Sequence, residues 1–198
     1  MEGTNNFVEL CGTVAGRPMF SHKSRNEDYY IFPLETERLS GAVDRLNVIV
    51  RHSMLCALEI EEKQRLAITG ELRSFNNRSG QGNRLVITVF AREMWFTDVE
   101  DQNSVHLRGA LCKPPNLRRT PMGREICDLM LAVNRRYGRS DYLPCIAWGQ
   151  LAQEAAELYV GDTIRLEGRI QSRKYIKNED GVPVEHTAFE VSIVDLEP

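Results

Sequence analysis

Residues 162–175 read DTIRLEGRIQSRKY, and this stretch shows the side-chain alternation of a β-strand. Ile164, Leu166 and Ile170 share one parity, whereas Arg173 and Tyr175 share the other. Successive side chains of a strand point to opposite faces. The pattern therefore predicts an aliphatic face toward a core and a polar, aromatic face toward solvent.

The sequence on either side of this strand predicts a small β-domain with one helix. The other expected elements are strands at 126–133, 142–148 and 187–194, a helix at 150–159, and a turn at 178–181. Pro144 has no N–H to donate, so we expect the strand at 142–148 to lie at a sheet edge or to bulge near its start.

The same pattern occurs twice in the chain, at a shift of about 97 residues. This shift places Leu10 on Leu107, Gly12 on Gly109, Arg38 on Arg135 and, after one insertion, Gly70 on Gly168. In the first half it predicts strands at 47–50, 66–75 and 85–90 and a helix at 54–60. Strands with one helix before the final hairpin are the order of an OB-fold barrel. We therefore predict an all-β fold of two tandem five-stranded OB barrels, each with one short helix.

The polar segment 97–102 (TDVEDQ) lies between the two patterned regions and is typical of a linker. It predicts one domain over 1–98 and a second over 103–198.

Bulk composition narrows the possible functions. A net charge of −3 over 198 residues argues against a binder that holds nucleic acid by overall positive charge. The five cysteines are odd in number and widely spaced, so neither a disulfide framework nor a zinc site is expected. No apolar run is long enough for a signal peptide or a membrane span. These features predict a cytoplasmic protein without metal or cofactor.

Rings and cations alternate with aliphatic residues in the second half, on the parity expected to face solvent. The rings are Tyr137, Tyr142, Trp148 and Tyr175. The cations proposed to accompany them are Arg119, Arg135, Arg136, Arg173, Lys174 and Lys177. Single-stranded nucleic acid is held by aromatic rings that stack on bases and by cations that follow the phosphates. Acidic residues are expected to be sparse on this face.

The second half resembles the bacterial single-stranded DNA-binding protein family. The resemblance rests on NSVHLRGAL (103–111), RRTPMGREICDLMLAVNRRY (118–137), YLPCIAWGQLAQ (142–153) and VGDTIRLEGRIQSRKYIKNEDG (160–181). It implies that four aromatic positions stack on DNA, and these positions fall on Tyr137, Tyr142, Trp148 and Tyr175.

The first half is similar to that family mainly through FVELCGTVAG (7–16) and RLAITGELRSF (65–75). Its matching positions hold Ser40, Arg45, Arg51 and, in a shortened hairpin, Phe75 or Asn77. The weaker nucleic-acid-binding candidates of this half are therefore Arg45, Arg51, Arg73 and Phe75. We expect the two halves to be unequal, with a full set of stacking rings only in the second.

The resemblance implies sequence-tolerant binding of single-stranded DNA in replication, recombination or repair. It also implies a homodimer, which would supply the four OB folds common in that family. The chain ends on VSIVDLEP, so recruitment of partners through an acidic C-terminal tail is not expected.

Two other functions compete with single-stranded DNA binding as interpretations of this sequence. An OB-fold assembly protein of the primosomal kind would use these faces mainly to bind other proteins. An enzyme is not expected, because no catalytic constellation of carboxylates, of Ser/His/Asp or of metal ligands is recognisable.

Overall fold

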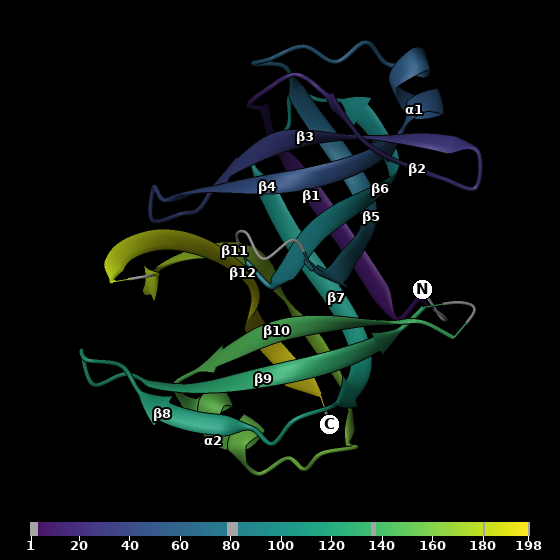
Figure 1. Ribbon diagram of the computed structural model, residues 1–198. Coiled ribbons are helices and arrows are strands. Elements are labelled where there is room, and N and C mark those ends of the chain that lie inside the picture. Colours follow the sequence, from purple (N-terminus) through teal and green to yellow (C-terminus); the bar gives the residue numbers. More distant parts are fainter. Residues whose placement is uncertain (1–3, 79–82, 136–137, 180, 198) are drawn as a thin grey trace. The chain divides into compact units, whose positions relative to one another are not determined.

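Strands dominate both halves of the chain, with one short helix in each (Figure 1). The computed structural model describes residues 4–78, 83–135, 138–179 and 181–197. In the first half the elements are β1 (Asn6–Val14), β2 (Met19–Ser24), β3 (Glu27–Glu37), β4 (Val43–Arg51), α1 (His52–Ala57), β5 (Arg65–Asn76) and β6 (Leu85–Phe96). In the second half they are β7 (Gln102–Leu111), β8 (Asn116–Arg119), β9 (Glu125–Asn134), β10 (Ser140–Trp148), α2 (Gln150–Ala156), β11 (Thr163–Glu179) and β12 (Val182–Glu197).

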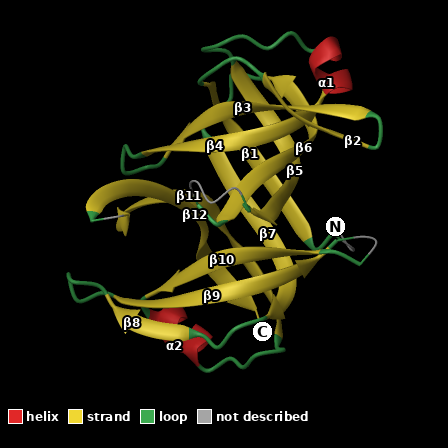
Figure 2. Ribbon diagram, in the orientation of Figure 1, coloured by secondary structure: helices red, strands yellow, loops and turns green. Residues whose placement is uncertain are grey.

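Each half forms its own closed barrel with the same strand order. In the first half the order is β2-β3-β4-β6-β5-β1, and pairing of β3 with β1 closes it. In the second half the order is β8-β9-β10-β12-β11-β7, and pairing of β7 with β9 closes it. The helix lies between the third and fourth main strands in both halves (Figure 2). This arrangement confirms two tandem OB-type barrels.

The strand registers obey the repeat that the sequence predicts. Thr13 pairs with Glu35 in the first barrel, and Ala110 pairs with Ala132 in the second, at the same shift. The parallel pairing that crosses each barrel is also repeated, with Val48 opposite Val89 and Cys145 opposite Val191. The second barrel differs mainly in its last hairpin, where β11 and β12 are longer than β5 and β6.

Repeated glycines mark places where two strands approach closely. A Cβ added at Gly109 would lie 2.5 Å from the carbonyl oxygen of Ala132, and one at Gly12 would lie 2.3 Å from that of Glu35. No real Cβ tolerates such a contact with backbone. The repeat therefore retains glycine where closing strands leave no room for a side chain.

The short strand β2 was not expected, and it forms a hairpin with β3; β8 in the same way forms a hairpin with β9. Between β2 and β3 the turn consists of Arg25 and Asn26, whose φ values of 50° and 63° are those of a tight two-residue hairpin turn.

Pro144 lies inside the sheet and not at its edge, which corrects the expectation for this strand. The antiparallel register of β10 with β9 runs through Pro144 without a shift. On its other side β10 pairs with β12 only at Cys145 and Ile146. Pro144 thus comes just before the two residues of β10 that pair with β12. Its missing N–H therefore removes none of the parallel pairings.

Contacts divide the chain into two compact units that interleave along the sequence. One, here the C-terminal unit, contains Met1–Asn6, Ser74–Ile87 and Val105–Pro198. The other, the N-terminal unit, contains Phe7–Arg73 and Thr88–Ser104. The distal part of the β5–β6 hairpin therefore packs with the second half of the sequence. A domain boundary at 98–103 stays a prediction.

Candidate nucleic-acid interface

Two exposed rings occupy the outer parity of β10. Tyr142 is 47% exposed and Trp148 is 37% exposed, whereas Leu143 and Ala147 between them are fully buried. Trp148 lies six residue steps along the strand from Tyr142, which corresponds to about 20 Å. Ile146 lies between the two rings on the same strand face but is only 2% exposed, at the point where β10 pairs with β12. The exposed surface of this strand face is therefore not continuous from Tyr142 to Trp148.

Tyr175 lies on β11 and is held from several sides. Its ring stacks on His186 of β12 with centroids 5.5 Å apart and planes 24° apart. The guanidinium carbon of Arg173 lies 5.7 Å from the ring centroid. The hydroxyl donates a hydrogen bond to Oδ1 of Asn83, at 2.9 Å. A base that stacks on Tyr175 must therefore replace an existing partner, which is not required at Tyr142 or Trp148.

Asn83 ties the β5–β6 hairpin to this part of the C-terminal unit. Besides accepting from Tyr175, its amide Nδ2 donates to the carbonyl oxygen of Thr187 on β12. Sequence reasoning missed Asn83 because more than ninety positions separate it from these partners, and no local pattern signals such a contact.

Tyr137 and Arg136, the remaining members of the predicted set between β9 and β10, lie outside the described residues. Their roles stay predictions.

Carboxylates pair with the candidate cations of the second half, so the expectation of sparse acidic residues is wrong. The pairs on β8, β9, β11 and β12 are Arg119 with Glu125 (2.9 Å), Arg173 with Glu190 (3.3 Å), Lys174 with Glu185 (2.9 Å) and Lys177 with Glu179 (3.1 Å). Neighbouring Arg118 pairs likewise with Asp128. A phosphate that approaches these cations therefore competes with a carboxylate.

Hydrogen bonds keep some of these carboxylates ionised. Gln153 and Arg119 donate to Glu125 and lower its pKa. Lys177 donates to Glu179 and lowers the pKa of that carboxyl. A bond to Asp128 in turn raises the pKa of Arg118. These groups are charged at neutral pH even at their ordinary pKa values, and the hydrogen bonds extend the pH range in which the charged forms persist.

Arg135 belongs to a buried ion pair. Its Nε donates to Asp141 at 2.6 Å, its terminal nitrogen donates to the other oxygen of that carboxylate, and the Asp141 side chain is fully buried. Asp141 also accepts from the backbone N–H of Ser74 at 2.6 Å. The Ser74 hydroxyl accepts from the backbone N–H of Tyr142 at 2.7 Å. This network fixes the start of β10, and we leave Arg135 out of the interface proposed below.

The first barrel repeats this ion pair. Arg38 donates to Asp44 through Nε at 2.6 Å and through a terminal nitrogen at 2.5 Å, and the Asp44 side chain is fully buried. Arg38 and Asp44 match Arg135 and Asp141 under the shift that relates the halves. A duplicated buried pair indicates a structural role that both barrels retain.

The weaker candidates of the first half lie in different environments. Arg45 pairs with Glu35 at 3.3 Å and donates to the carbonyl oxygen of Ala15 at 3.1 Å. Arg51 is exposed. Arg73 pairs with Glu71 on the same strand. Phe75, at the end of β5, is 53% exposed.

Three rings of the N-terminal unit escaped the sequence analysis. His22, Tyr29 and Phe90 contact one another in a row on β2, β3 and β6. The hairpin that brings His22 opposite Tyr29 was not anticipated, although Arg25 and Asn26 between two polar, aromatic stretches are a turn signal.

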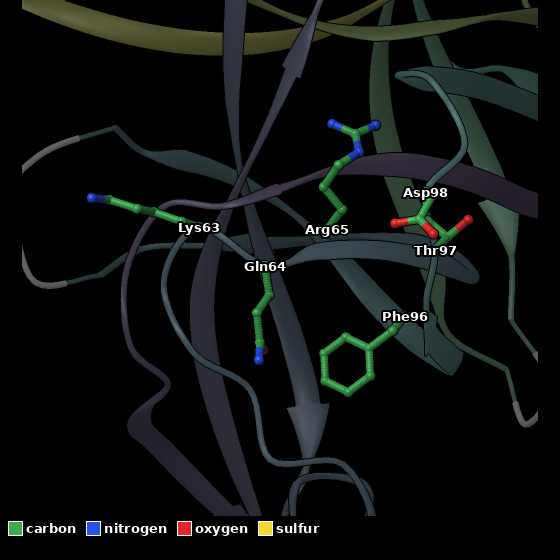
Figure 3. A pocket seen from close by; sticks show the side chains of 6 residues that line it. All are labelled: Lys63, Gln64, Arg65, Phe96, Thr97 and Asp98. Carbon is green, nitrogen blue, oxygen red and sulfur yellow. The ribbon is translucent and has the colours of Figure 1, made fainter.

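The N-terminal unit also has a shallow hollow beside the end of β6 (Figure 3). It is lined by Lys63, Gln64, Arg65, Phe96, Thr97 and Asp98. The side chains of Gln64 and Arg65 point in opposite directions there. Arg65 is already paired with Asp101 at 2.8 Å and donates to the carbonyl oxygen of Val99.

Within residues 4–78, 83–135, 138–179 and 181–197, no three His, Cys, Asp or Glu side chains are grouped to hold a metal ion. In that same part of the chain, no helix has the length and apolar character needed to cross a membrane.

Known proteins resemble this chain both in part and over nearly its whole length. Residues 102–198 match the Single-strand binding protein family. Single-stranded DNA-binding protein B of Bacillus subtilis (strain 168) is 38% identical over 107 residues, which are 48% of this chain and 93% of that protein. Single-stranded DNA-binding protein 2 of Listeria innocua is 38% identical over 86 residues, and the match covers 40% of this chain and about half (54%) of that protein.

The crystal structure of the wild-type single-stranded DNA binding protein from Thermus aquaticus superposes with a TM-score of 0.78 at 25% identity. That match covers 97% of this chain and 91% of the other, so it includes both barrels. The relatives carry the names of DNA-binding proteins and not of enzymes. With two OB-type barrels, exposed rings on β10 and this sequence match, the chain belongs to the single-strand binding protein family.

Proposed function

We propose that this protein binds single-stranded DNA without sequence preference, through base stacking on the outer face of the C-terminal unit. The observation that carries the proposal is the pair Tyr142 and Trp148, two large rings left exposed on a strand whose other face is fully buried. Solvent-exposed rings on one strand face suit the stacking of successive bases, because every base has a π-face. The names of the relatives agree with this substrate.

Stacking contributes more to this interface than phosphate contacts do. Every described cation proposed for it has a carboxylate partner, so its charge is largely compensated before DNA arrives. Tyr175 joins the interface after exchange of Arg173 or His186 for a base. Arg173, once displaced from the ring, keeps its pair with Glu190 at 3.3 Å, so a phosphate competes with that carboxylate for it.

Substitution of Trp148 tests this function. Each stacked ring contributes about 1 to 3 kcal/mol, so Trp148→Ala is expected to weaken binding of a labelled oligo-dT strand by about 5-fold to over 100-fold. Fluorescence anisotropy measures the affinity. Trp95→Ala is the matched control, because Trp95 is 44% exposed but lies at the far end of β6 in the N-terminal unit.

The competing assembly function predicts a different result. If the β10 face bound proteins, Trp148→Ala would change the molar mass of the complex and leave DNA affinity intact. Unchanged anisotropy titrations for Trp148→Ala and Trp95→Ala alike would refute the proposed function.

The protein acts as a homodimer with four barrels, in the cytoplasm, where replication, recombination or repair exposes single strands. Light scattering at micromolar concentration checks the dimer, and a strict monomer would contradict it.

A further inference from the structure

The N-terminal unit carries a row of rings flanked by arginines at positions that the family motifs do not mark. We propose that His22, Tyr29 and Phe90 form a second base-stacking surface for single-stranded DNA, with Arg51, Arg73 and Arg92 as its cations. This inference rests on the proposed function and extends it to the first barrel. It opposes the expectation that only the second half stacks bases.

Strand pairing builds the row. The tight turn at Arg25 and Asn26 sets the register of β2 against β3, so that His22 lies directly opposite Tyr29. Their rings stack with centroids 4.8 Å apart and planes only 7° apart. Tyr29 in turn contacts Phe90 of β6, with centroids 5.9 Å apart. Cross-strand aromatic pairs of this kind stabilise a hairpin while leaving ring faces at the surface.

The row lies on the outer face of its barrel. Phe32 and Leu34, of opposite parity to Tyr29 on β3, are fully buried in the core. Tyr29 and Phe90 are half-buried, and His22 at the end of the row is exposed. The exposed His22 ring therefore terminates a stack that a nucleobase can continue.

Guanidinium groups surround the row. The Arg92 and Arg73 guanidinium carbons lie 4.9 Å and 5.7 Å from the Phe90 ring centroid. Both arginines share one carboxylate, Glu71, which accepts from Arg92 at 3.0 Å. Arg51 pairs in register with Tyr29, and none of the described acidic side chains forms an ion pair with it.

Charge and ring placement together favour a nucleic-acid strand as the ligand. Arg73 and Arg92 share Glu71, and Arg51 belongs to none of the described ion pairs, so positive charge remains for phosphates. Arginines beside stacked rings are the combination that binds single strands without reading their sequence. A purely hydrophobic protein partner would not call for this excess of cations.

Strand length separates the two stacking surfaces in an experiment. One OB fold occupies about 4 to 16 nucleotides, so a dT strand of about 12 engages one barrel and a strand of about 40 can engage both. The double variant Tyr29→Leu/Phe90→Leu keeps apolar bulk but removes the π-faces. We expect it to bind the 12-mer as wild type does and the 40-mer at least about 5-fold more weakly. That loss should persist at high salt, because stacking is not screened.

Two further variants keep the test decisive. Phe96→Leu is the control, since Phe96 is exposed on the same strand β6 but outside the row. His22→Ala removes the exposed end of the row and its stacking on Tyr29, so it should lower the thermal unfolding midpoint only slightly while it weakens binding of the 40-mer.

The outcomes distinguish failure of this inference from failure of the proposed function. If the double variant and His22→Ala bind the 40-mer as tightly as the Phe96→Leu control while Trp148→Ala binds weakly, the second surface does not exist. A change in molar mass without a change in DNA affinity would also overturn it, because the row would then be a protein interface. If Trp148→Ala loses no affinity for either strand, the proposed function itself fails.

Discussion

Carboxylates that neutralise the cations of the candidate interface should weaken the salt dependence of DNA binding. The perturbation is the triple variant Glu125→Gln/Glu179→Gln/Glu185→Gln. It removes the partners of Arg119, Lys177 and Lys174, which now lie 2.9, 3.1 and 2.9 Å from the cations. Glutamine keeps the size of each side chain and one acceptor oxygen while it removes the charge.

The expected size follows from counterion release. Each phosphate that a cation neutralises on a single strand contributes about −0.7 to the slope of log K against log salt. Five cations at the interface would give a slope of about −3.5 if none had a competing partner. Because carboxylates released by DNA attract counterions again, the wild-type slope should be shallower. Freeing three cations should steepen it by up to about 2 and raise the affinity at low salt.

Fluorescence anisotropy titrations between about 50 and 300 mM salt measure both slopes. A second triple variant, Glu59→Gln/Glu62→Gln/Glu100→Gln, is the matched control. It changes net charge by the same amount, and its three exposed carboxylates form no described ion pair. Equal slopes for wild type and both variants, or a wild-type slope already near −3.5, would refute the view that these ion pairs compete with phosphates.

Two other predictions concern the buried groups of the second barrel. Asp141→Ala leaves the Arg135 guanidinium without its buried partner, so denaturant unfolding should show a free energy of unfolding about 3 to 5 kcal/mol lower than in wild type. The control Asp195→Ala, at an exposed position, should change this free energy little. Burial raises the pKa of the Cys145 thiol well above its ordinary value. The thiolate is the form of cysteine that reacts with labelling reagents. In a thiol-labelling assay of the native protein at pH 8, exposed Cys56 should therefore react first, and Cys145 should react only when the protein unfolds. Rapid labelling of Cys145 in the native protein would contradict its burial.

The alternation of buried and exposed side chains along β10 explains why part of the interface could be predicted from the sequence. Tyr142 and Trp148 are exposed, as their parity against Leu143 and Ala147 predicts, because side-chain direction along a strand depends only on position in that strand. The internal repeat likewise predicts the barrel order and the glycines at strand closures.

The partners of each side chain were decided by the tertiary structure alone. Arg135 has the parity and charge of a DNA contact, yet closure of the barrel places Asp141 against it. Ser74 and Asn83 come from the other half of the sequence, and only folding brings them to Tyr142 and Tyr175.

The sequence by itself therefore determined the barrel type, its duplication and the outward direction of the β10 rings, since these follow from periodicities of a few residues. Only the tertiary structure decided that carboxylates neutralise the cations and that His22, Tyr29 and Phe90 form one row. The physical reason is that these contacts join different strands. Their geometry depends on register and turn shape, which composition and alternation within one strand do not encode.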